Sequence, residues 1–140
     1  MNSTIIRSSR GMPTISVSWG ELIDKITILE IKEKRLKSPE AISNVRRELV
    51  ILTRVVQGLQ PQLGEVDELK RGLKSINETL WEVEDRIRAK EASKTFDQQF
   101  IELARSIYFN NDKRARIKRQ INELLSSEFI EEKQYTPYGT

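Results

Sequence analysis

The chain of 140 residues contains neither cysteine nor histidine. Their absence excludes disulfide bonds, thiol nucleophiles, zinc sites built from Cys and His, and every catalytic triad that uses a histidine. Any catalysis would have to use carboxylates, Lys, Arg, Tyr or hydroxyl groups, with a hard cation such as Mg²⁺ as the natural cofactor. The lack of cysteine also fits a cytoplasmic protein, which is the location we predict.

Long apolar runs and an excess of charge of one sign are missing as well. No apolar stretch approaches the roughly 18 residues that cross a membrane, so we predict no membrane span. The 24 basic and 21 acidic residues leave a net charge of only +3, which does not favour a nucleic-acid partner. Residues 1–13 carry Arg7 and Arg10 but no apolar core, and we interpret them as a flexible leader rather than a signal peptide.

Apolar residues do recur at helical spacing from Val66 to Ile87. Successive positions are 3, 4, 3, 4, 3 and 4 residues apart, which is a heptad seam along one face of a helix. The seam consists of Val66, Leu69, Leu73, Ile76, Leu80, Val83 and Ile87. Such a stripe needs apolar neighbours in water, so we expect the rest of the chain to be arranged around this helix.

Two shorter helices are predicted before it. Residues 14–18 alternate polar and apolar side chains and predict a short extended segment. Ser18 and Glu21 then form a capping-box pattern that opens a helix running from about Trp19 to Lys37. Ser38 followed by Pro39 predicts the start of the next helix. Its apolar stripe is spaced 3, 4, 3, 4, 3 and consists of Ile42, Val45, Leu49, Leu52, Val56 and Leu59.

A second capping-box pattern, Thr95–Gln98, predicts the start of a fourth helix. Its apolar register consists of Phe100, Leu103, Ile107, Ile117, Ile121 and Leu124. We therefore predict an all-α fold: an antiparallel, coiled-coil-like four-helix bundle of two hairpins behind a short extended N-terminal segment. Residues 14–128 would form a single helical domain and residues 129–140 a C-terminal tail.

The predicted helices differ in length, because the first two span about 28 Å and the last two about 40 Å. Part of the long hairpin would then have no cover from its own chain. We therefore expect a homodimer that buries the remaining stripe. Trp81 lies one position off the seam and is our candidate interface residue.

Three stretches of the sequence are characteristic: Gly20–Lys32, Leu80–Glu91 and Arg105–Tyr135. Together they resemble a family of small uncharacterised bacterial and phage proteins, a domain of unknown function. The resemblance covers roughly Ile15 to Tyr138 and implies no established activity and no assigned catalytic residue. Members of that family are sometimes found beside or joined to glycosyltransferases, which implies a glycosyltransferase-type partner and a role in polysaccharide synthesis.

Polar residues interrupt two of the predicted seams. Asn110 and Arg114 occupy core positions of the fourth helix if that helix is continuous, and Glu33 does so in the first. A buried Arg needs a carboxylate, and Glu78 lies about level with Asn110. Three interpretations remain open: the helix breaks here, with Asn111 or Asp112 capping a new one; a buried ion pair fixes the register; or the residues line a polar ligand pocket.

Acidic residues also gather at helical spacing. Glu78, Glu82 and Asp85 share one face of the third helix, and Glu21 and Asp24 form a second pair. This resembles the magnesium sites of all-helical nucleotide pyrophosphohydrolases, in which carboxylates hold the metal. Arg105 or Lys113 would then lie near phosphate. The alternative, which we favour in a chain with 21 acids, is solvated salt bridges with neighbouring Arg and Lys residues.

Our first functional hypothesis from the sequence is a non-enzymatic helical interaction or assembly module without a cofactor. A magnesium-dependent pyrophosphohydrolase-like enzyme is the second, and a phage structural component the third. The basic residues from Lys113 to Arg119 spread around their helix instead of forming one stripe, so we do not expect a nucleic-acid interface.

Overall fold

The computed structural model describes residues 11–59 and 63–139, so most of the predicted leader lies outside the described residues. Within them the chain forms four long helices and no β-strand: α2 (Trp19–Arg35), α3 (Pro39–Val56), α4 (Leu63–Ala92) and α5 (Gln98–Leu124). The all-α prediction is confirmed. None of these helices is long and apolar enough to cross a membrane.

Two of the helix starts follow the predicted caps. The Ser18 hydroxyl accepts a hydrogen bond from the amide of Glu21 at 3.2 Å, and Ser38 accepts one from the amide of Ala41 at 3.4 Å. Pro39 occupies the first turn of α3, where its missing N–H costs nothing.

The cap of α5 lies two residues later than the pattern predicts. Asp97 is the N-cap, and its Oδ1 accepts a hydrogen bond from the amide of Phe100 at 3.0 Å. Thr95 instead closes α4, because its amide donates to the carbonyl of Lys90 at 2.9 Å. The predicted cap at Thr95 is therefore wrong. Thr95 belongs to the end of α4, and Asp97 caps α5.

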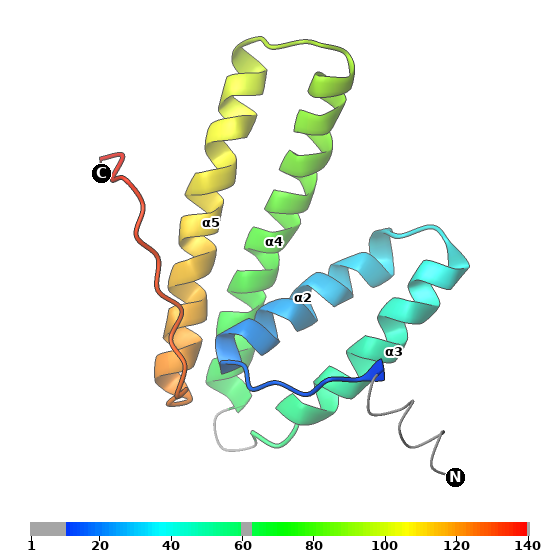
Figure 1. Cartoon of the computed structure of the whole chain (residues 1–140), viewed down its shortest axis with the longest axis vertical. Helices are drawn as coiled ribbons and strands as arrows, with labels where there is room; N and C mark the ends of the chain where they lie inside the picture. The colour runs from blue at the N-terminus through cyan, green and yellow to red at the C-terminus, as the bar shows by residue number, and fades with distance from the viewer. Residues whose placement is uncertain (1–10, 60–62, 140) are drawn as a thin grey trace.

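The four helices form two hairpins (Figure 1). α4 and α5 lie side by side as the long hairpin, and α2 crosses the end where α4 begins and α5 ends. α3 returns alongside α2, and its last residue, Val56, reaches the shared core. Among the described residues α3 has no backbone alongside α4 or α5, so one chain by itself does not close a four-helix bundle.

The core lies where α2, α4 and α5 meet. Its centre consists of four fully buried side chains, Ile23, Val66, Leu73 and Ile121. The heptad seam of α4 supplies two of them, and Val83 is buried further along the same helix. Residues 125–139 have no regular secondary structure and run back along α5 (Figure 1). The site described next lies beside this core.

Candidate functional site

The start of α2 is fixed against the end of α5. The Gly20 amide donates to Oδ1 of Asn122 at 2.7 Å, and the Trp19 amide donates to the hydroxyl of Ser127 at 3.0 Å. A Cβ at Gly20 would lie 2.5 Å from the carbonyl oxygen of Lys118, which is closer than real Cβ contacts come. Only glycine permits this approach, and the approach sets where the next turn of α2 points its side chains.

That next turn carries a buried carboxylate, Asp24, which is 1% exposed. Its Oδ1 accepts hydrogen bonds from Nε of Arg114 and from Nδ2 of Asn77, both at 2.9 Å, and its Oδ2 accepts one from Nη2 of Arg114. The guanidinium therefore binds the carboxylate through two parallel bonds, the geometry that gives the strongest charge-assisted pairs. The hydrogen bond to Asp24 raises the pKa of Arg114 above its ordinary value.

Thr27 completes this network of α2, α4 and α5. Its hydroxyl donates to the backbone carbonyl of Asp24 at 2.8 Å and accepts a hydrogen bond from Nδ2 of Asn77 at 2.8 Å. Asn77 is 6% exposed and Thr27 is fully buried. Within the described part of the chain no buried side-chain N or O atom lacks a hydrogen-bond partner. The satisfied network holds three helices at one relative position.

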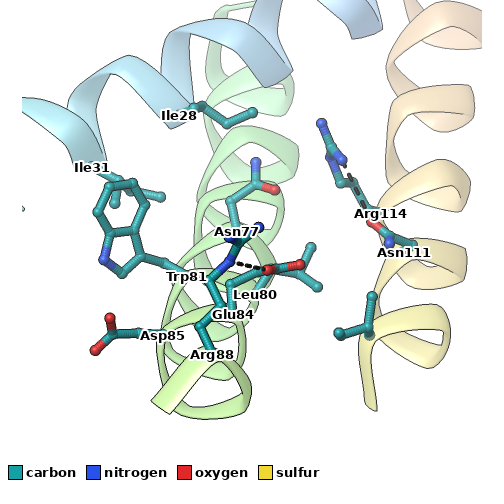
Figure 2. A pocket seen from close by; sticks show the side chains of 11 residues that line it. Ile28, Ile31, Asn77, Leu80, Trp81, Glu84, Asp85, Arg88, Asn111 and Arg114 are labelled. Carbon is teal, nitrogen blue, oxygen red and sulfur yellow. Dashed lines mark hydrogen bonds and ion pairs between the residues drawn. The ribbon is translucent and has the colours of Figure 1, made fainter. Parts of the chain in front are cut away.

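A cavity of about 490 Å³ opens beside the network, between α2, α4 and α5 (Figure 2). Most of its surface is apolar. The apolar side chains that line it are Ile28, Ile31, Leu80, Trp81 and Ile107.

The polar lining of the cavity falls into two groups. Asn77, Asn111 and Arg114 lie beside the network, and Glu84, Asp85 and Arg88 come from the next turns of α4. A mostly apolar hollow with a few converging polar groups is typical of small-molecule sites.

The tail adds a second set of contacts around α5. Nζ of Lys118, itself buried, lies 2.8 Å from carboxylate oxygens of both Glu21 and Glu131. Burial alone would lower the pKa of Lys118, but the hydrogen bonds to Glu131 and Glu21 outweigh it and raise that pKa. The hydrogen bond from Lys118 lowers the pKa of the Glu131 carboxyl. The start of α2, the end of α5 and the tail are thus joined through one ammonium group.

Further along, the tail covers an aromatic patch on α5. The Tyr138 hydroxyl donates to Asp112, and its ring lies 5.2 Å from that of Tyr108 and 4.9 Å from that of Phe109. A second cavity, of about 690 Å³, lies between the tail and α5 and shares Asn111 and Arg114 with the first.

The predicted polar seam is only partly assembled. α5 is continuous from Gln98 to Leu124, so the interpretation that the helix breaks near Asn110 is wrong. Arg114 does pair with a buried carboxylate, but the partner is Asp24; Glu78 is exposed. Asn110 donates to the carbonyl of Ser106 in its own helix at 2.8 Å.

Glu33, the remaining member of that seam, lies away from the network. Its Oε2 accepts a hydrogen bond from Nε of Arg46 in α3 at 3.0 Å. This pair joins the two helices of the short hairpin near the surface. Trp81, the candidate interface residue, is half-buried and lines the cavity between α2, α4 and α5.

The five acids of the predicted magnesium site are not brought together. Glu21 pairs with Lys118, Asp24 with Arg114, and Glu82 with Arg35. Glu78 and Asp85 are exposed on α4. Within the described ranges no three acidic side chains lie close enough together to hold a metal ion.

The two candidate phosphate ligands do not converge on a site either. The guanidinium of Arg105 lies over the ring of Phe109, 5.7 Å from its centre, and Lys113 is exposed.

Sequence reasoning missed Asn77, Thr27, Gly20 and Lys118. Asn77 offered a usable signal, because it lies four residues after Leu73 and three before Leu80 and so shares a helical face with both. A polar residue on such a face has to find a partner when the face is buried. Gly20 and Lys118 carried no such signal, because their roles depend on contacts between residues about 100 positions apart.

Comparison with known proteins identifies the family of the chain. The model of a family of unknown function (DUF6165) matches residues 13–140, which is nearly the whole chain. No curated protein and no solved structure shows significant similarity to this chain. The match includes all four helices, the network around Asp24 and the tail. The chain therefore belongs to the family of unknown function DUF6165.

Proposed function

We propose that this protein is a non-enzymatic helical interaction module that assembles as a homodimer through an exposed flank of α3. The observation that carries the proposal is a pair of exposed apolar side chains, Ile51 and Val55, on one flank of that helix. Ile51 and Val55, each 49% exposed, lie one turn apart on one flank of α3, outside the stripe that packs on α2. Val50, 51% exposed, lies on the other flank, and the exposed Arg47 and Arg54 lie between the two flanks. Neighbouring apolar side chains that stay exposed on a helix are candidates for an interaction surface.

The total surface is large enough for such an interface. The chain exposes 10311 Å², whereas a compact monomer of this mass exposes about 7500 Å². A standard interface takes about 800 Å² from each partner, so there is surface enough for one.

A second copy is the natural occupant, because a two-fold axis lets one face meet itself. We propose that the α3 helices of two copies lie antiparallel, with Ile51 near the axis. Each α3 would then gain a neighbour on the side away from α2. The regular apolar stripe of α3 would stay packed on α2 in this arrangement. A glycosyltransferase-type partner stays a prediction from the family resemblance.

The ion pairs support a role without catalysis. The carboxylates best placed for chemistry are already bound: Asp24 by Arg114, Glu21 by Lys118 and Glu82 by Arg35. The buried Asp24 would have to leave Arg114 and Asn77 before it could bind a metal ion.

Sedimentation velocity over a range of micromolar concentrations tests the proposal. We expect a reversible dimer for the natural protein and a monomer for Ile51→Glu, because the charge would be buried in the interface. Ile101→Glu is the matched control: Ile101 is also a helical isoleucine and is 48% exposed, but it lies on α5. A natural protein that stays monomeric, or an Ile101→Glu variant that dissociates while Ile51→Glu does not, would overturn the proposal.

A further inference from the structure

We propose that the cavity beside the Asp24–Arg114 pair binds an uncharged ring that has an apolar face and carries a hydrogen-bond donor next to an acceptor on one edge. Sugar rings and nucleobases share this chemistry. The site is independent of the proposed dimer, because it lies between α2, α4 and α5 and not on α3.

The acceptor of the site is the side-chain oxygen of Asn77. Both hydrogens of its Nδ2 are used, since they go to Oδ1 of Asp24 at 2.9 Å and to Oγ1 of Thr27 at 2.8 Å. Because the Thr27 hydroxyl donates to a backbone carbonyl, it can only accept from Asn77, and this fixes the orientation of the amide. The amide oxygen of a side chain that is more than nine-tenths buried is thereby left for a partner in the cavity.

The donor of the site is the guanidinium of Arg114. Its Nε and one N–H of Nη2 are bound to Asp24, and Nη1 makes only a long contact of 3.5 Å with Oδ1 of Asn111. The guanidinium has five N–H groups, so its outer edge keeps donors for a ligand. Asp24 holds that edge in place, which reduces the entropy lost on binding.

The apolar wall faces this polar edge. Figure 2 shows Trp81 and Ile31 on one side of the opening and Arg114 and Asn111 on the other, with Asn77 between them. A flat ring entering between the two sides would place its face on the indole and its edge on the polar groups. The volume of about 490 Å³ lies within the range of small-ligand sites, roughly 300–1000 Å³.

The charges of the lining argue against an anion. Glu84 and Asp85 balance Arg88 and Arg114, and Glu84 already pairs with Arg88 at 3.1 Å. Asp24 adds a further negative charge directly behind Arg114. A phosphate or carboxylate would meet no excess positive charge here, whereas a neutral ring would not need one.

The test uses the indole N–H signals of the full-length ¹⁵N-labelled protein during titration with methyl β-glucoside and, separately, with adenosine. We expect a saturable shift of the Trp81 signal with at least one of the two probes. Trp19, at the far end of the molecule's core, is the internal control and should not move. A response to the glycoside alone identifies a sugar site, and a response to adenosine alone identifies a nucleobase site.

Variants and an anionic probe complete the test. Ile107→Trp should fill the cavity and weaken binding by at least about tenfold, while Ile101→Trp on the exposed side of the same helix should leave it unchanged. Thermal unfolding of both variants checks that they fold. No saturable shift of Trp81 with either neutral probe would overturn the proposal. Tighter binding of adenosine monophosphate than of adenosine, or unchanged binding in a folded Ile107→Trp, would do so as well.

Discussion

α2 and α3 are almost equal in length, at 17 and 18 residues, yet eight residues of α2 are buried and only Val45 of α3 is. The difference is not visible in their apolar spacing, since α3 has the more regular stripe. It comes from their neighbours: among the described residues α2 packs along α3, α4 and α5, whereas α3 packs along α2 and reaches the core through Val56 at its end. The spacing of apolar residues therefore shows that a helix has a face to bury. The topology decides how much of that face is buried within one chain.

The two helices also differ in the polar groups they carry. α2 brings Asp24 and Thr27 into the core with hydrogen-bond partners from two other helices. The ion pairs of α3, such as Glu48 with Lys25, lie at the surface. Three pairs of matched substitutions, in order of expected effect, test whether burial, and not composition, separates the two helices, and a pH experiment then tests the contact that holds the start of α2.

Removing the carboxylate of Asp24 should have the largest effect. Asp24→Ala leaves Arg114 without its counter-ion and Asn77 without an acceptor, and we expect a loss of about 3 to 4 kcal/mol in the free energy of unfolding. Glu48→Ala in α3 should cost less than about 0.5 kcal/mol, because its ion pair is exposed. Urea denaturation measures both. Equal losses would mean that the Asp24 network does not stabilise the core.

Truncating leucines compares the two apolar stripes. Leu29→Ala in α2 removes a side chain that is 3% exposed and should cost about 3 kcal/mol. Leu49→Ala in α3 removes a half-buried side chain and should cost about 1 kcal/mol. Both leucine changes are made in the Ile51→Glu variant, which we expect to be monomeric. Urea denaturation of these double variants then measures the free energy of unfolding without a contribution from dimer formation. The reverse order of losses would show that α3, not α2, carries the core.

A methyl group at two glycines tests the close approach of α2 to α5. Gly20→Ala would place Cβ 2.5 Å from the carbonyl oxygen of Lys118 and should cost about 2 kcal/mol. At Gly58, just after α3, the nearest atom to an added Cβ is 3.5 Å away, so Gly58→Ala should change stability by less than about 0.5 kcal/mol. Thermal unfolding of the two variants decides, and an unaffected Gly20→Ala would contradict the close approach.

The smallest expected effect is on the pH dependence of stability. It concerns the contact of Lys118 with Glu21 at the start of α2 and with Glu131 in the tail. Because Lys118 lowers the pKa of Glu131 below its ordinary value of 4.5, the carboxylate stabilises the fold at pH values above 4.5. That stabilisation is lost as the pH falls through the lowered pKa. Natural protein and Glu131→Gln should therefore differ in melting temperature at neutral pH and converge in acid. A difference that persists or grows in acid would contradict the pairing with Lys118.

The sequence predicted what depends on near neighbours in the chain. The caps at Ser18 and Ser38 connect residues three positions apart, so the sequence predicts them directly. The spacing of apolar residues likewise predicts each helix. The pairing of Asp24 with Arg114 spans 90 positions and depends on how α2 crosses the long hairpin. The acidic spacing therefore suggested a metal site, while the fold gave Asp24, Glu21 and Glu82 a basic partner each.

Native-state hydrogen exchange at two protein concentrations tests the central claim most directly, since it follows α2 and α3 in the same molecule. In dilute solution we predict that amides in the middle of α2 exchange only through global unfolding, while those of α3 exchange much faster through local opening. At high concentration the α3 amides should slow as the dimer forms. Equal protection of the two helices at both concentrations would contradict the account.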